Sequence, residues 1–151
     1  MAKKKFSYTT AEGAVETRTS ERVYTHVVLG RRNLVQARER AASVTERKMH
    51  AVNYDYYRNY AETEVGQPYP GRQWTTNQAD HDAAVQLVAE YPTVEAYIEA
   101  KIEQEIARIN DDGTGDAGPE IVLQWSQSSR AAQASVSGHA KWHVGVRVAA
   151  L

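Results

Sequence analysis

The chain of 151 residues is long enough for one domain of ordinary size, and it is too short for an enzyme with a separate cofactor domain. Its 42% hydrophobic and 25% charged residues are typical of a globular protein rather than a disordered one. Because the sequence has no cysteine, disulfides, thiolate zinc sites, iron–sulfur clusters and cysteine nucleophiles are excluded. We expect a single domain over residues 1–151.

The start of the sequence does not predict a secretory signal. Residues 1–5 are basic, but residues 6–10 are too polar to form the apolar core of a signal peptide. No run approaches the roughly 18 consecutive apolar residues that a membrane span needs. We therefore expect a cytoplasmic protein that does not bind a membrane.

Charge is distributed unevenly, although the formal net charge is only -1. Residues 1–58 carry 12 Lys or Arg against 6 Asp or Glu, residues 59–120 carry 3 against 13, and residues 121–151 carry 3 against none. One interpretation is that these are ordinary solvated surfaces. The other is that the two basic ends form one electropositive surface for an anionic partner, while the acidic middle meets the basic surface of a second copy.

Alternation of polar and apolar residues predicts β-strands near the start of the chain. Phe6 and Tyr8 alternate with polar residues, residues 11–14 supply a turn, and the alternation then resumes, which is typical of a hairpin. Residues 23–29 form the most apolar strand of the first half, with two faces that are largely buried.

Helical patterns fill the middle of the chain. Asn33 is a candidate N-cap for a helix that continues to about Glu64, Asn77 or Asp80 can cap a second helix, and Thr93 can cap a third. The spacing of three and four predicts an inward stripe on each long helix. For the first helix the stripe is Ala41, Thr45, Met49, Val52, Tyr56 and Tyr60, and for the third it is Val94, Tyr97, Ile98, Ile102, Ile106 and Ile109.

Strands are predicted again after residue 120. Residues 121–126 alternate, and residues 139–148 show the clearest alternation of the chain, with Trp142, Val144, Val146 and Val148 facing the core. The order of strands, helices and strands predicts an α+β fold. We expect an antiparallel sheet of N-terminal and C-terminal strands, packed on one side by a central block of about three helices.

No enzyme signature is present. The sequence lacks the phosphate-binding loop, the dinucleotide fingerprint, the nucleophile elbow and the H-E-x-x-H zinc motif. His139 and His143, on the predicted last strand, would lie about 13 Å apart and could not chelate one ion. We therefore predict no catalytic residue, no metal site and no cofactor.

Two basic surfaces are candidates for binding an anion. On the predicted last strand, alternate residues project about 6 to 7 Å apart, a spacing that suits successive phosphates, and arginines of neighbouring strands could join them. On the first helix, basic and aromatic residues at spacings of seven, seven and four share one side. This side could bind a nucleotide, form a subunit interface, or simply face solvent. The strand set is Lys141, His143 and Arg147 with Arg18, Arg22 and Arg130, and the helix set is Arg40, Arg47, Tyr54 and Arg58.

The run TRTSERVYTHVV at residues 17–28 leads into Arg31, Arg32 and a helix. It resembles segments of small accessory proteins of bacteriophages. The resemblance implies a small dedicated binder, such as a counter-defence protein that occludes a host protein or sequesters a nucleotide signal.

Three functions follow from these features. The first is a non-enzymatic, self-associating binding protein that sequesters an anionic nucleotide-like ligand or binds nucleic acid through a basic surface. The second is an inhibitor of a host protein that acts through tyrosine-rich and acidic surfaces. The third is a phosphodiesterase-like enzyme that uses His26, His139 or His143.

Overall fold

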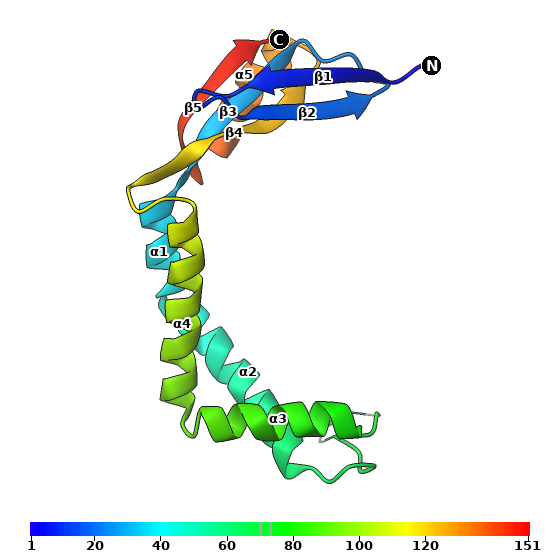
Figure 1. Cartoon of the computed structure of the whole chain (residues 1–151), viewed down its shortest axis with the longest axis vertical. Helices are drawn as coiled ribbons and strands as arrows, with labels where there is room; N and C mark the ends of the chain where they lie inside the picture. The colour runs from blue at the N-terminus through cyan, green and yellow to red at the C-terminus, as the bar shows by residue number, and fades with distance from the viewer. Residues whose placement is uncertain (70, 73) are drawn as a thin grey trace. The chain divides into compact units, whose positions relative to one another are not determined.

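The computed structural model describes every residue except 70 and 73. The described residues form five helices and five strands in two antiparallel sheets, which confirms the α+β class. None of the helices in this part of the chain combines the length and apolar content needed to cross a bilayer. The elements are β1 (Lys4–Thr9), β2 (Val15–Ser20), β3 (His26–Asn33), α1 (Leu34–Ala41), α2 (Val44–Glu62), α3 (Gln78–Glu90), α4 (Val94–Asp111), β4 (Ala117–Ser126), α5 (Ser129–His139) and β5 (His143–Ala150) (Figure 1).

The chain divides into two compact units. Unit 1 comprises residues 1–37 and 109–151, and unit 2 comprises residues 38–108. Because β3 and β4 are paired neighbours in one sheet, unit 2 is an insertion between two adjacent strands of unit 1. The N-terminal and C-terminal segments therefore belong to the same unit.

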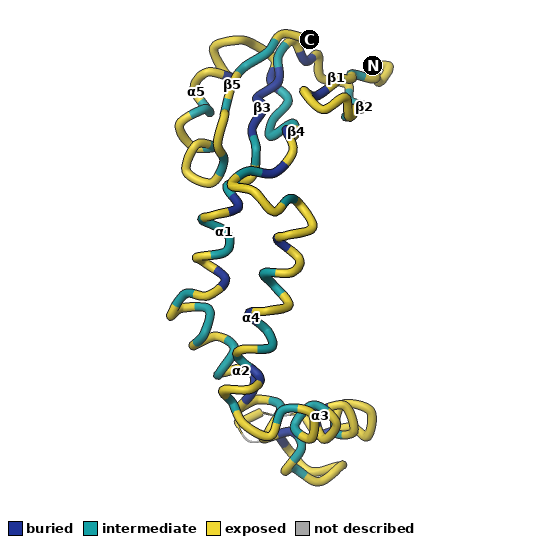
Figure 2. Tube along the Cα trace, turned by 60° about the vertical axis from the view of Figure 1, so that its left-hand side comes forward, coloured by how far each residue is buried: buried dark blue, intermediate teal, exposed yellow. Residues whose placement is uncertain are grey.

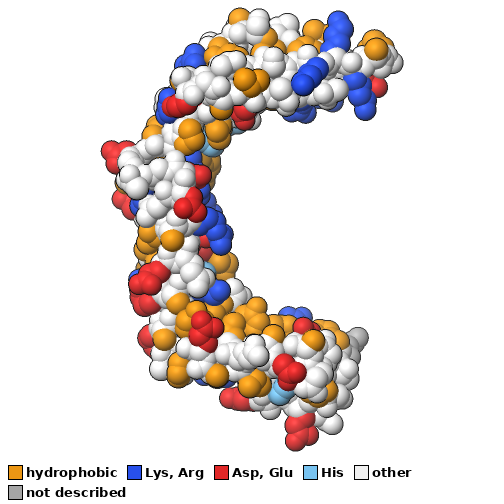
Figure 3. Space-filling model, viewed as in Figure 1, with side chains coloured by type: hydrophobic (Ala, Val, Ile, Leu, Met, Phe, Trp, Pro, Cys, Tyr) orange, Lys and Arg blue, Asp and Glu red, His pale blue; other side chains and the backbone are white. Residues whose placement is uncertain are grey.

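The two units differ in charge. Unit 1 contains 10 Lys or Arg against 7 Asp or Glu, and unit 2 contains 8 against 12. Within unit 1, Lys and Arg side chains gather over β1 and β2 in the space-filling view (Figure 3). Unit 1 thus carries a net positive charge and unit 2 a net negative one, although residues 38–58 of the basic start belong to unit 2 and residues 109–120 of the acidic middle belong to unit 1.

Unit 1 is built around a three-stranded sheet with the order β4-β3-β5. The central strand β3 is antiparallel to both neighbours, so β4 and β5 run parallel and α5 connects them. Val27, Val28 and Leu29 are completely buried, so both faces are covered in this part of the predicted strand (Figure 2). The prediction of a strand from residue 23 is corrected, because β3 begins at His26 and Val23 is 51% exposed. Helix α5, which was not predicted, contacts all three strands of this sheet.

The predicted N-terminal hairpin is confirmed. Strands β1 and β2 pair in antiparallel register from Lys4 opposite Ser20 to Thr9 opposite Val15. Gly13 closes the turn with a φ of 85°, a conformation that glycine adopts without steric cost. The hairpin forms a sheet of its own, separate from β4-β3-β5.

The first predicted helix is two helices. Asn33 does cap α1, accepting from the Gln36 amide at 3.0 Å, but the helix ends at Ala41. Ser43 then caps α2 by accepting from the Glu46 amide at 3.3 Å. A serine that satisfies a free helical amide favours a new N-terminus over continuation of the old helix.

This break changes the face that α2 buries. Ala41 and Tyr60, predicted to face inward, are buried, but Met49 and Val52 of the same predicted stripe are 48% and 67% exposed. Tyr54, which lies outside the stripe, is buried instead. A stripe that starts at Ala41 crosses the break, so its phase does not continue into α2. The inward stripe of the third predicted helix, now α4, is confirmed, since each member is buried or half-buried.

The end of the chain differs most from the prediction. Residues expected to begin the last strand belong to the end of α5, which Ser128 caps by accepting from the Ala131 amide at 3.1 Å. Strand β5 begins at His143, and Gly145, with a φ of 61°, interrupts its alternation at a register shift against β3. As a result Trp142 and Val144 are exposed at 52% and 37%.

The burial of β3 leads to a stability expectation. Leu29→Ala removes a completely buried side chain and should lower the free energy of unfolding of unit 1 by about 2–5 kcal/mol. Val15→Ala, at a position that is 62% exposed, should change it by less than about 0.5 kcal/mol. Hydrogen exchange of the β3 amides measures the change in the free energy of unfolding for each variant. Equal changes in the two variants would contradict the central position of β3.

Candidate functional site

The predicted row of cations on the last strand is not formed. Lys141 lies in the turn before β5 rather than on a strand. Arg147 donates from Nε and Nη2 to the two carboxylate oxygens of Glu120, each at 3.0 Å. Because Glu120 is only 5% exposed, this pair compensates the charge of Arg147 inside unit 1.

The two C-terminal histidines lie closer together than predicted. The ring centroids of His139 and His143 are 6.3 Å apart, because α5 ends at His139 and the chain turns back before β5. The ring of His139 contacts the Gln124 side chain at 3.1 Å, and that of His143 contacts the His139 carbonyl at 3.2 Å. In the described part of the chain, no three potential metal ligands lie together.

The arginines expected to surround the last strand lie elsewhere in unit 1. Arg130 is in the first turn of α5, Arg22 is in the connection from β2 to β3, and Arg18 is on β2 of the separate hairpin sheet. The guanidinium of Arg18 lies 5.2 Å from the ring centroid of Tyr24. The predicted arrangement on strands next to β5 is therefore wrong.

The helix set does not share one surface either. Arg40 belongs to α1 and the other three to α2, so the break between the helices removes their common phase. Tyr54 is 2% exposed, and its hydroxyl donates to the Tyr91 carbonyl at 2.7 Å. Arg47 pairs with Glu99 and Arg58 with Asp55. Tyr54 and Arg47 thus contact other segments of unit 2, whereas the Arg58 pair lies within α2.

The β1–β2 hairpin has two chemically different faces. Phe6 lies opposite Arg18 and Tyr8 opposite Glu16, so these four side chains share one face, here called the inner face. Phe6 packs edge-on against Tyr24 with ring centroids 5.2 Å apart. The inner face is thus the one that contacts the rest of unit 1.

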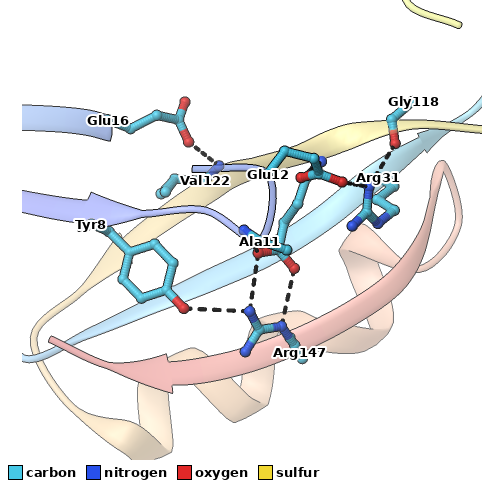
Figure 4. A network of polar contacts seen from close by, with 9 residues as sticks. Tyr8, Ala11, Glu12, Glu16, Arg31, Gly118, Val122 and Arg147 are labelled. Atoms are coloured by element: carbon cyan, nitrogen blue, oxygen red, sulfur yellow. Dashed lines mark hydrogen bonds and ion pairs between the residues drawn. The ribbon is translucent and has the colours of Figure 1, made fainter. Parts of the chain in front are cut away.

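Carboxylates fix the hairpin to β4, as Figure 4 shows. Glu16 accepts from the Val122 amide, and Glu12 accepts from the Glu120 amide at 3.1 Å while pairing with Arg31. Strand β4 is at an edge of its sheet, where amides that point outward lack a strand partner. The two hairpin glutamates provide that partner.

Glu120 completes the attachment from the other direction. Its carboxylate accepts from the Ala11 amide at 3.0 Å as well as from Arg147, and Arg147 also reaches the Tyr8 hydroxyl at 3.4 Å (Figure 4). The hydrogen bond from Arg147 holds the pKa of Glu120 below its usual value, and that from Arg31 does the same for the pKa of Glu12. Both carboxylates are therefore ionised at neutral pH.

The opposite, outer face of the hairpin projects away from these contacts. Its residues alternate with those of the inner face, and all of them are exposed. All but one carry a side chain that donates hydrogen bonds, and none is acidic, because Glu12 and Glu16 are used on the inner side. The outer face consists of Lys5, Ser7 and Thr9 on β1 and Val15, Thr17 and Thr19 on β2.

The sequence pattern predicts the hairpin but does not indicate which of its faces is exposed. The signal was present, since residues 15–20 alternate hydroxyl side chains with charged ones and residues 3–5 are all lysine. The alternation does not indicate which face of the hairpin packs against the rest of unit 1. The structure thus exposes a two-stranded ribbon of lysine, serine and threonine side chains on a hairpin held by ion pairs.

Removing one carboxylate should loosen the hairpin. We expect Glu120→Gln to weaken the attachment of the hairpin, because the carboxylate that accepts from both Ala11 and Arg147 becomes a neutral amide. The free energy of opening that hydrogen exchange measures at the Ala11 amide should fall by about 1–3 kcal/mol. Glu21→Gln, in the exposed connection after β2, is the matched control and should leave that free energy unchanged. Equal protection in both variants would show that Glu120 does not anchor the hairpin.

Acid should act on the same attachment. Since the folded pKa values of Glu12 and Glu120 are lowered, their contribution is fully present above the ordinary value of about 4.3 and is lost as pH falls through the folded values. We expect the protection factors of the Ala11 and Glu120 amides to fall together in that acidic range. In a variant with Glu12→Gln and Glu120→Gln the decline should be absent, and an identical decline would assign it to other groups.

Comparison with known proteins identified no related protein. No protein family model matches the chain, and neither the curated proteins nor the solved structures include a significant match. The function is therefore inferred from the chemistry of the hairpin and of unit 2.

Proposed function

We propose that the protein is a non-enzymatic nucleic-acid-binding protein, and that the outer face of the β1–β2 hairpin enters the major groove of double-stranded DNA. The observation that carries the proposal is the exposed ribbon of Lys5, Ser7, Thr9, Thr17 and Thr19, which contains no acid. A two-stranded ribbon of this kind fits the major groove, which is about 12 Å wide.

The side chains of the outer face suit the edges of base pairs. Alternate residues on a strand project about 6 to 7 Å apart, and the paired strands lie about 4.8 Å from each other. Lys5 lies opposite Thr19, and Ser7 lies opposite Thr17. Lysine donates to the acceptors of guanine, while serine and threonine hydroxyls donate or accept at several bases.

Further cations flank the ribbon where the phosphate backbones would run. Lys3 and Lys4 precede the outer-face residues of β1, and Arg22 follows β2. All three are exposed. Phosphate contacts of this kind supply affinity and position, whereas base contacts supply specificity. The firm attachment of the inner face supports the proposal, because a ribbon that is already ordered loses less conformational entropy on binding.

Replacing a ribbon lysine should weaken DNA binding in a salt-dependent way. We expect Lys5→Ala to lower the affinity for a short labelled duplex several-fold and to reduce the slope of log K against log salt by about 0.9 between about 50 and 200 mM. Lys48→Ala, an exposed lysine of α2, is the matched control and should change neither quantity. Fluorescence anisotropy measures both.

Lys141→Ala distinguishes this surface from the one first predicted. Loss of binding in Lys141→Ala, with Lys5→Ala unaffected, would move the site to the turn before β5 and contradict the ribbon. Absence of binding by the unaltered protein to duplexes of any sequence would contradict nucleic-acid binding altogether.

Replacing the ribbon hydroxyls tests base recognition separately. Thr17→Val and Thr19→Val preserve the β-branched shape and remove the hydroxyl groups. We expect the double variant to lose preference among duplexes selected from a random pool while keeping its salt dependence. Thr63→Val, whose hydroxyl donates within α2, is a control of the same chemistry. An unchanged sequence preference would exclude these threonines from base contacts.

A further inference from the structure

Unit 2 contains a cluster of stacked aromatic rings that nucleic-acid binding does not use. Tyr60 of α2 stacks on Trp74 with ring centroids 5.5 Å apart, and Tyr69 stacks on the same indole at 4.9 Å. The ring centroid of Tyr56 lies 5.4 Å from that of Tyr60 and 5.2 Å from that of Tyr69. Tyr60 and Tyr69 pack on Ala84 of α3, so the cluster is joined to the core of unit 2.

Part of this cluster remains open to solvent. Tyr56 and Trp74 are each 39% exposed, whereas Tyr60 is only 5% exposed. They border an open depression of about 350 Å³. Its lining residues are Tyr56, Tyr60, Trp74, Thr75, Asn77 and Asp80.

Asp80 is the acidic residue among the described residues that line the depression, and hydrogen bonds with Asn77 hold it in place. The Asn77 side-chain amide donates to its carboxylate at 2.7 Å, and the Asp80 amide donates to the Asn77 side chain at 2.8 Å. Burial, together with the nearby Asp80 carboxylate, raises the pKa values of Tyr60 and Tyr56. The two phenols therefore stay neutral and can donate hydrogen bonds.

We infer that this depression binds an arginine side chain of a basic protein partner. Aromatic ring faces attract cations, and Trp and Tyr are the stronger such faces. A guanidinium can stack on the exposed face of Trp74 and donate to Asp80, two contacts that together discriminate arginine from lysine. The excess of acidic residues in unit 2 attracts a basic partner from a distance.

The openness of the site favours a side chain of a protein over a free small molecule. Small-molecule sites usually enclose most of their ligand, whereas a shallow depression with a central aromatic group is typical of a protein–protein contact. The inference is independent of the proposed DNA binding, because it uses none of the residues of unit 1. The two activities can therefore be tested separately on the same protein.

Binding of a defined peptide tests the inference. The probe is a fluorescein-labelled peptide of alternating glycine and arginine, and its analogue contains citrulline, which keeps the shape of arginine without the charge. We expect the arginine peptide to bind the full-length protein about tenfold or more tightly than the citrulline peptide and than the corresponding lysine peptide. Equal binding of the arginine and citrulline peptides, or no binding, would overturn the inference.

Matched variants locate the contact. Asp80→Asn preserves size and removes the charge, and Trp74→Leu removes the aromatic face; each should weaken binding of the arginine peptide about tenfold. Asp82→Asn, two residues further along α3, is the control and should have less than about a twofold effect. Circular dichroism confirms that each variant is folded. If Asp82→Asn weakened binding as much as Asp80→Asn, general acidity rather than the depression would account for the peptide, which would refute the site.

Discussion

The pairing of Arg147 with Glu120 is the interaction on which the arrangement of unit 1 depends. These residues belong to β5 and β4, the two strands on either side of β3, so their ion pair spans the central strand. The same carboxylate accepts from the hairpin turn at Ala11, and the same guanidinium reaches Tyr8 of β1. A buried carboxylate with several charge-assisted hydrogen bonds is costly to leave unpaired, so the contacts favour one position of the hairpin over others.

This attachment also determines which charges remain for binding. Unit 1 uses its glutamates on the inner side of the hairpin, where Glu12 and Glu16 satisfy amides of the edge strand β4. Arg31 compensates the charge of Glu12 and Arg147 that of Glu120, and the outer face consists of Lys5, hydroxyl side chains and Val15. In unit 2 Arg47 and Arg58 are paired with acids, while Asp80 lies beside aromatic rings at the depression. The two units differ in net charge because unit 1 contains more Lys and Arg than Asp and Glu, whereas unit 2 contains fewer.

The elements that depend on neighbouring residues could be predicted. The hairpin turn at Gly13 and the helix caps at Asn33, Asn77 and Thr93 involve contacts over three or four residues, and all of them are present. Helix α5 was not predicted, and the last strand was predicted to begin at residue 139, whereas β5 begins at His143. The break at Ser43 was missed because one serine cap competes with a helical pattern of many residues. The candidate cations do not form the two predicted rows, because a charge in a sequence carries no information about its partner.

By itself, the sequence determined the α+β class, the opposite charge of the ends and the middle, and the two sets of side chains on the hairpin. Strand alternation assigns Lys5 and Ser7 to one face of β1 and Tyr8 to the other, and the pairing register of the hairpin adds Thr17 to the first face and Glu16 to the second. Only the tertiary structure decided which face packs and which cations are compensated. The reason is the distance along the chain: Arg147 meets Glu120 across 27 residues and Tyr8 across 139, and Glu12 meets the Glu120 amide across 108. Such contacts depend on the pairing of β3 with β4 and β5, which no local pattern specifies.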